Sequence, residues 1–156
     1  MPRGREIVGL PVIDLEQGEE LGRIQDLLCD PHRRLVNSLV LASAKLPYGT
    51  RLVKFEQVQT QGADAFAVSS SRLLAGIAPD NLVKWQKIKG TPIFNVQGSE
   101  IGTLEDIIVE VPSGKMEAME VSGGLISDIL DGRKTIGIDR VLTWGPDAII
   151  VQEEVN

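Results

Sequence analysis

The sequence predicts an all-β protein made of two small antiparallel β-barrels in tandem, joined by a short helical connector. Three observations predict this class. The same Gly, Pro and Asp residues recur in the same order in both halves of the 156 residues. Short segments rich in β-branched residues alternate with turn signals, which is typical of strands and hairpins. The composition is 42% hydrophobic but only 4% aromatic, so it supports a core made mainly of aliphatic side chains.

The internal repeat organises the chain into two copies of one fold. Gly9 and Pro11 of the first copy recur as Gly90 and Pro92. We therefore expect a first barrel over residues 5–70, a short helical linker over 71–86 and a second barrel over 87–154. The matched blocks are residues 7–18 with 88–98, residues 19–28 with 99–108, and residues 55–68 with 138–151.

Each copy begins with a strand that contains a proline, from Gly9 to Leu15 in the first copy. The next segment is ambiguous, because Leu21, Ile24 and Leu28 also fit a helical period. An internal glycine, which lowers helix propensity by about 1 kcal/mol, favours a strand. Turn signals close the segment in both copies and favour the same interpretation.

A hairpin partner, a short strand, a turn and a last strand complete each copy. Short strands of this kind curl into a closed or half-closed barrel, which removes exposed strand edges. The expected segments are Leu35 to Leu41, Leu52 to Phe55 and Ala65 to Val68 in the first copy, and Met116 to Val121, Thr135 to Ile138 and Ala148 to Val151 in the second.

The segment between the copies predicts a short helix. Leu73, Leu74 and Ile77 fit one helical turn, and Pro79 ends or restarts it. The segment is not rich in Gly and Ser, so we expect the two barrels to sit in a fixed relation, with Trp85 packed at their junction. Each barrel is expected to close around its own apolar interior.

Two repeated motifs carry a resemblance to a known family: Gly9-Leu-Pro-Val with Gly22-Arg-Ile-Gln-Asp26, and Gly90-Thr-Pro-Ile with Gly102-Thr-Leu-Glu-Asp106. The endings Gly62-Ala-Asp64-Ala65 and Gly145-Pro-Asp147-Ala148 support it. The chain resembles a tandem PRC-barrel protein. That module occurs in the H subunit of photosynthetic reaction centres, in the C-terminal domain of a ribosome maturation factor and in small bacterial proteins. The resemblance implies a small antiparallel β-barrel that serves as an assembly or docking surface, without a catalytic site.

Few residues offer catalytic or metal-binding chemistry. Cys29 and His32 are the only cysteine and histidine, and they lie three residues apart. They form either a nucleophilic or metal-binding pair, or a core thiol next to an exposed histidine. A zinc site needs about four ligands, and Val109 replaces Cys29 in the second copy, so we favour the structural alternative. We expect no enzyme activity, no bound metal and no cofactor.

Two aspartates recur in both copies, Asp26 as Asp106 and Asp64 as Asp147. Recurrence fits paired carboxylates or cation sites. It also fits structural carboxylates that a duplicated fold repeats, because aspartate accepts backbone N–H groups at bends and turns. We favour the structural role for both pairs.

The loop over residues 122–134 is the candidate partner-binding segment. Its apolar residues fit one side of a helical turn. Either this turn plugs the open end of the second barrel, or it forms an exposed patch that docks a partner. The residues concerned are Leu125, Ile126, Ile129 and Leu130.

The formal net charge of −6 is concentrated in the second half, where residues 88–156 carry five basic and twelve acidic side chains. This balance argues against direct nucleic-acid binding and favours a protein partner with basic character. A homodimer through strand edges or the apolar loop stays open. The sequence has neither a signal-peptide pattern nor an apolar run that spans a membrane, so we expect a cytoplasmic protein.

Composition, repeat and resemblance together predict a non-enzymatic protein-interaction or assembly module, bacterial by the habit of the family. One alternative is a ribosome-associated accessory factor that docks on a basic ribosomal protein. Another is a peripheral accessory of a membrane electron-transfer complex.

Overall fold

The computed structural model describes residues 1–42, 50–69, 81–123 and 133–152. The strands of the first half are β1 (Pro11–Asp14), β2 (Glu19–Asp30), β3 (Leu35–Ala42), β4 (Thr50–Lys54), β5 (Val58–Gln61) and β6 (Phe66–Val68). Those of the second half are β8 (Pro92–Asn95), β9 (Glu100–Val109), β10 (Met116–Ser122), β11 (Arg133–Gly137), β12 (Val141–Trp144) and β13 (Ile149–Val151). The short remaining elements are α1 (Gly4–Ile7), β7 (Val83–Lys84), α2 (Trp85–Ile88) and the 3-10 turns η1 (Phe55–Gln57) and η3 (Ile138–Arg140).

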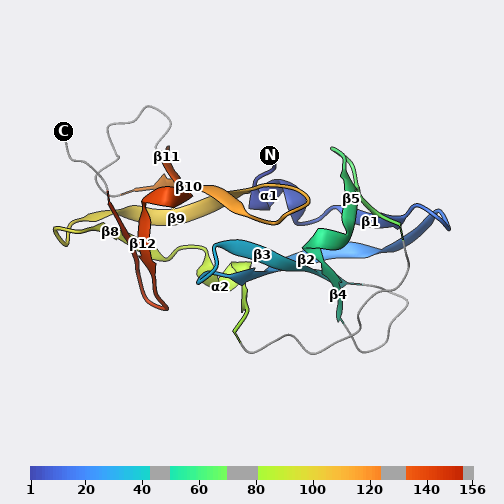
Figure 1. Ribbon diagram of the computed structural model, residues 1–156, viewed down its shortest axis with the longest axis horizontal. Coiled ribbons are helices and arrows are strands. Elements are labelled where there is room, and N and C mark those ends of the chain that lie inside the picture. The colour runs from blue at the N-terminus through green and yellow to red at the C-terminus, as the bar shows by residue number, and fades with distance from the viewer. Residues whose placement is uncertain (43–49, 70–80, 124–132, 153–156) are drawn as a thin grey trace.

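Each half forms one curled sheet, and the two sheets have the same topology (Figure 1). The strand order is β4-β3-β2-β1-β6-β5 in the first sheet and β11-β10-β9-β8-β13-β12 in the second. The predicted all-β class with two tandem units is therefore confirmed. Most neighbouring strands are antiparallel, but β1 runs parallel to β6 and β8 runs parallel to β13.

The two halves exchange their entry segments. The residues before α1 pair with β9 of the second half. Arg3 forms an antiparallel β-bridge with Ile108, and the Val109 N–H donates to the Pro2 carbonyl oxygen at 3.0 Å. The equivalent segment before α2 is β7, which pairs with β2 of the first half. Each short helix therefore packs on the long strand of the other repeat.

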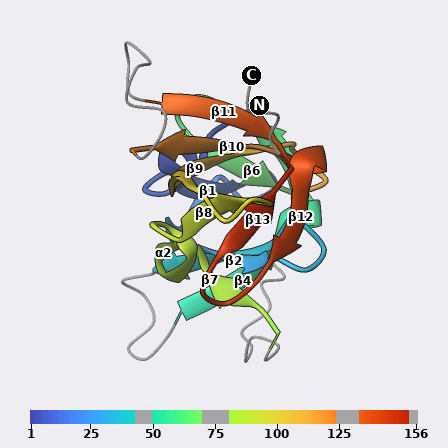
Figure 2. The same cartoon turned by 90° about the vertical axis from the view of Figure 1, so that its left-hand side faces the viewer.

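The two long hairpins, β2–β3 and β9–β10, meet at the centre of the molecule (Figures 1 and 2). Leu35 and Lys115 form an antiparallel β-bridge. The Val36 N–H donates to the Gly114 carbonyl oxygen at 2.7 Å. The Met116 N–H donates to the Arg34 carbonyl oxygen at 2.9 Å. Backbone hydrogen bonds thus join the hairpin turns directly.

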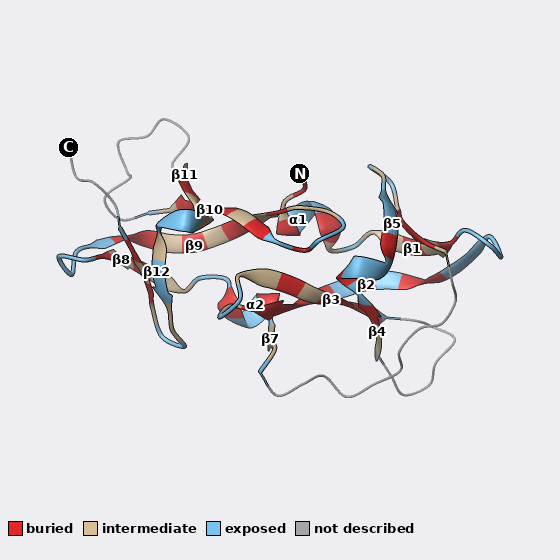
Figure 3. Ribbon diagram, in the orientation of Figure 1, coloured by how far each residue is buried: buried red, intermediate tan, exposed pale blue. Residues whose placement is uncertain are grey.

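The buried apolar side chains form one cluster to which both halves contribute. Leu27 and Leu39 of the first half belong to the same cluster as Ile107 and Met119 of the second, and all four are fully buried. Figure 3 shows buried residues along the central strands of both sheets. The expectation that each barrel closes around a separate interior is therefore wrong. The exchanged helices and the hydrogen-bonded hairpin turns bring the two apolar faces together, and the alternation of side chains along a strand does not reveal such contacts.

The connector is described only at its end. Residues 70–80, which include the predicted helical positions Leu73, Leu74 and Ile77, lie outside the described residues. Trp85 begins α2, is 5% exposed and packs against α1, as predicted for the junction. Among the described residues, no helix has the length and apolar character needed to cross a membrane.

Candidate interaction site at the junction of the repeats

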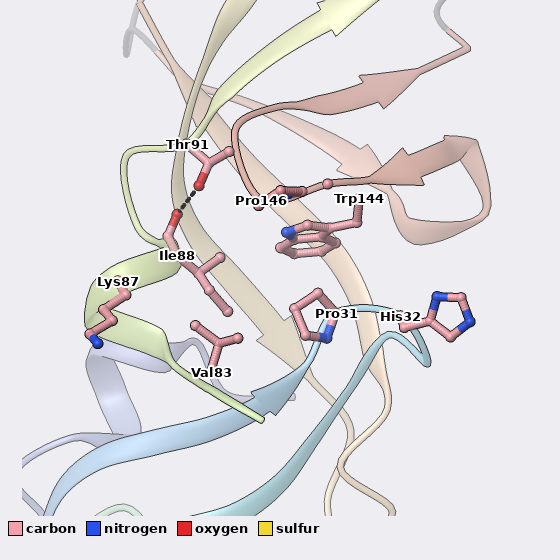
Figure 4. A pocket seen from close by; sticks show the side chains of 9 residues that line it. Pro31, His32, Val83, Lys87, Ile88, Thr91, Trp144 and Pro146 are labelled. Atoms are coloured by element: carbon pink, nitrogen blue, oxygen red, sulfur yellow. Dashed lines mark hydrogen bonds between the residues drawn. The ribbon is translucent and has the colours of Figure 1, made fainter. Parts of the chain in front are cut away.

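A pocket of about 260 Å³ lies where the two halves meet. Figure 4 shows the Trp144 indole between Pro31 and Pro146, with Val83 and Ile88 opposite. Both halves and the segment between them contribute to its wall. The lining residues are Pro31, His32, Val83, Lys87, Ile88, Thr91, Trp144, Gly145 and Pro146.

Local hydrogen bonds hold each part of this wall in place. Arg34 has a φ of 58°, and its guanidinium donates to the carbonyl oxygens of Pro31 and His32, which fixes the β2–β3 turn. The Thr91 hydroxyl donates to the Ile88 carbonyl oxygen just after α2. The β12–β13 turn that carries Trp144 is closed by the Gly145 N–H, which donates to the Ala148 carbonyl oxygen at 2.9 Å. The pocket is therefore preformed.

The matching turn of the first half forms without an aromatic residue. Gln61 occupies the position of Trp144, and the Gly62 N–H donates to the Ala65 carbonyl oxygen at the same distance of 2.9 Å. A turn of this type therefore does not require an indole. Trp144 is half-buried, and part of its ring is available at the pocket.

Cys29 and His32 do not form a reactive pair. Cys29 is fully buried in β2, whereas His32 is exposed in the turn that follows. Burial, with the charge of Asp26 as a second cause, raises the pKa of the Cys29 thiol. A buried thiol with a raised pKa is a poor nucleophile, so the structural interpretation of both residues is confirmed.

We expect Cys29 to be inert toward thiol reagents in the native state. Labelling by a chromogenic disulfide reagent should be slow in buffer and fast in denaturant, since only unfolding exposes the thiolate. Cys29→Val, which copies Val109, should change the free energy of unfolding by less than about 1.5 kcal/mol, because the swap is apolar and of similar volume. Rapid labelling of the native protein would contradict this assignment.

Asp26 and Asp106 are structural, as predicted. Each lies at a β-bulge of its long strand and accepts the N–H of the next residue at 2.8 Å. Each also accepts an N–H from the helix of the other repeat, Asp106 from Arg5 at 3.3 Å and Asp26 from Gln86 at 3.4 Å. The recurring carboxylates therefore join the two halves.

Ion pairs strengthen the α1 side of this junction. The Arg5 guanidinium contacts Asp106 at 3.4 Å and Glu120 at 3.5 Å, and Arg3 pairs with Glu120. The positions of Arg3 and Glu120 correspond to Lys84 and Val40 on the other side. The α1 contact is thus ionic, while the α2 contact relies on backbone donation and packing.

Burial is the main cause that raises the pKa of Asp106, although the N–H groups of Ile107 and Arg5 oppose it. Between the ordinary aspartate pKa of about 3.9 and this raised value, the folded chain binds more protons than the unfolded chain. The contribution of Asp106 to stability is therefore highest at low pH and falls as the pH rises through that window.

We expect the wild type to gain stability relative to Asp106→Asn when the pH is lowered from about 7 to about 4.5, because only the wild type has this titration. Urea unfolding of both proteins at the two pH values measures the difference, and shifts common to all other carboxyl groups cancel. A difference that widens in favour of Asp106→Asn at low pH would contradict the sign.

Asp64 and Asp147 are both exposed, each in a turn between the last two strands of its half. Within residues 1–42, 50–69, 81–123 and 133–152, no three His, Cys, Asp or Glu side chains come together as a metal site. The predicted partner-binding residues Leu125, Ile126, Ile129 and Leu130 lie outside the described residues, so that assignment stays a prediction.

Comparison with protein families agrees with the repeated topology. The model of the PRC-barrel domain matches residues 2–73 and, a second time, residues 80–154. The chain belongs to the PRC-barrel family. A search of curated proteins gave no match. The PRC-barrel is a general module, so membership alone leaves the partner of this tandem protein open.

Sequence reasoning missed the pocket between the two PRC-barrels. Its walls come from the β2–β3 turn, α2 and the β12–β13 turn, which are far apart in the sequence. One signal was available, because the copies differ at Gln61 and Trp144 while the surrounding turn residues recur. An aromatic residue in only one copy of a shared turn indicates a role other than folding of that turn.

Proposed function

We propose that this tandem PRC-barrel protein is a non-enzymatic protein-interaction or assembly module. The observation that carries the proposal is the preformed pocket at the junction, which both repeats build. Its wall offers apolar surface, one ammonium group and one imidazole. This composition suits recognition of another protein, because interfaces use aromatic and apolar anchors within a polar rim.

The architecture supports an assembly role. Exchanged helices, bridged hairpins and one apolar cluster hold the two PRC-barrels in a fixed relation. A rigid surface loses little conformational freedom on association, so more of the contact energy appears as affinity. The overall charge of −6 favours partners with basic regions elsewhere on their surface.

Cross-linking and affinity capture with the tagged full-length chain test this function in lysate of the source cells. We expect the same one or few proteins in every replicate, at a constant ratio to the bait. Partners from ribosomal particles or from a membrane electron-transfer complex would identify the assembly concerned. Failure to enrich any protein above a tag-only control would contradict the proposed function.

A further inference from the structure

We infer that the junction pocket binds an extended, acidic segment of a partner protein by enclosing one apolar side chain of that segment beside Trp144. This inference rests on the proposed interaction function and specifies the chemistry of the partner. Three properties support the inference: the size of the pocket, two lining residues that differ from their counterparts in the first repeat, and the charge of the segment that contains α2.

The size of the pocket matches one side chain. Sites that enclose small molecules usually have volumes of roughly 300–1,000 Å³. The junction pocket has about 260 Å³ and opens to the surface. The apolar groups of Trp144, Pro31 and Val83 line it, so the entering group is apolar too. A single Leu, Met or aromatic side chain that projects from an extended segment meets these conditions.

The two halves differ at this place in ways that the fold does not require. Trp144 and Lys87 correspond to Gln61 and Glu6 in the first half, where the same turn and the same short helix form. Because either residue is compatible with the local structure, the aromatic ring and the ammonium group are features of the pocket rather than of the scaffold. Both lie in its wall (Figure 4).

The segment that places Lys87 in the lining is positive although the chain as a whole is acidic, and Lys84 and Lys89 are the sequence neighbours of the lining residues Val83 and Ile88. Residues 81–91 contain three lysines and no carboxylate, and Lys84, Lys87 and Lys89 are all exposed. Figure 4 shows Lys87 and His32 at opposite ends of the pocket. An extended segment that crosses the pocket therefore meets the Lys87 ammonium group at one end and the His32 imidazole at the other. The ammonium group favours Asp and Glu next to the apolar anchor of that segment.

Two carboxylates neighbour the lining residues in the sequence. Asp30 is buried, accepts the Arg33 N–H at 3.1 Å and lies 3.8 Å from the Arg33 guanidinium. Asp147 is exposed in the turn after Pro146. One paired and one exposed carboxylate do not reverse the positive charge of the three lysines, so an acidic segment is favoured over a basic one.

Selection from a displayed library of random peptides on the immobilised full-length protein identifies the preferred segment, with counter-selection on Trp144→Gln. We expect enriched sequences to combine one apolar residue with flanking Asp or Glu. The enriched peptide, labelled with fluorescein, then serves as the probe in anisotropy titrations at low and high salt. Enrichment of basic or uncharged sequences would overturn the inference.

Two variants that copy the first half test the contacts. Trp144→Gln should weaken binding of the peptide at least about tenfold, because it removes the aromatic anchor. Lys87→Glu should weaken it at least about threefold at low salt and less at high salt, as expected for a rim charge. Lys54→Glu has the same change in charge at an exposed lysine that does not line the pocket, and its dissociation constant should stay within about twofold of the wild-type value.

Unfolding curves of the variants separate binding from folding, since both substitutions occur naturally in the matching repeat. Equal binding by wild type and Trp144→Gln would overturn the inference. Adsorption to phosphatidylserine vesicles that depends on the lysines but not on Trp144 would also overturn it. Self-association of the chain through this pocket would do the same. If the partner from lysate is still captured by Trp144→Gln, the interaction function stands and the pocket assignment fails.

Discussion

Trp85→Ala is expected to lower the free energy of unfolding by about 3–5 kcal/mol, the loss typical for removal of a buried aromatic side chain. Trp85 is 5% exposed and lies where α2 meets α1. The corresponding residue of α1 is Gly4, and a Cβ built on Gly4 would lie 3.5 Å from the Trp85 Nε1 atom. The large side chain of one helix thus fills the space that the glycine of the other leaves. Its removal opens a cavity between the repeats.

The other tryptophan provides the matched control. Trp144 is half-buried at the junction pocket, and Gln61 holds its place in the first repeat. Trp144→Ala should therefore cost less than about 1.5 kcal/mol, since partly exposed side chains remove less apolar area from water. Urea unfolding followed by circular dichroism measures both values. Equal losses in the free energy of unfolding would contradict the assignment of Trp85 to packing between the repeats and of Trp144 to recognition.

Gly114→Ala is expected to lower the free energy of unfolding by about 3 kcal/mol or more, because a strained backbone and a steric clash combine. Gly114 has a φ of +80°, and a Cβ there would lie 2.3 Å from the Val36 carbonyl oxygen. That contact is between the two hairpins, which cannot keep their hydrogen bonds and accept the methyl group. The loss should therefore appear as separation of the repeats as well as strain.

Gly98→Ala isolates the clash from the backbone strain. Gly98 has a φ of +82°, and nothing lies within 4 Å of the position that a Cβ would take there. The strain of alanine is thus nearly the same, about 1–2 kcal/mol, without the collision. Thermal unfolding of both variants gives the difference. If Gly114→Ala loses no more stability than Gly98→Ala, the two hairpins are not in close contact at Gly114.

The repeated topology was readable from the sequence because its steric requirements fall on particular residues. A Cβ at Gly22 would lie 2.6 Å from the Ala42 carbonyl oxygen. One at Gly102 would lie 2.5 Å from the Ser122 carbonyl oxygen. Only glycine satisfies both copies, so the spacing of these residues revealed the duplication. The structural role of Asp26 and Asp106 was predictable because the carboxylate recurs at the same place in both copies, where it accepts a backbone N–H.

Contacts between the copies were not readable. Strand alternation shows which face is apolar, but not which other face covers it. The sequence also does not reveal that β1 pairs in parallel with β6, because the pattern of side chains along a strand does not indicate the direction of its neighbour. The sequence indicates a turn in place of β5, since the exposed polar residues Gln59, Thr60 and Gln61 give no apolar alternation. The pocket depends on these contacts, so it was also missed.

Hydrogen exchange with mass spectrometry, measured in increasing urea, tests most directly whether the two PRC-barrels behave as one body. It compares the free energy of opening for β2–β3 with that for β9–β10. One shared apolar cluster predicts the same opening free energy and the same urea dependence for both hairpins. Two values that differ by more than about 1.4 kcal/mol, a factor of ten in the opening equilibrium, would show that the repeats unfold separately.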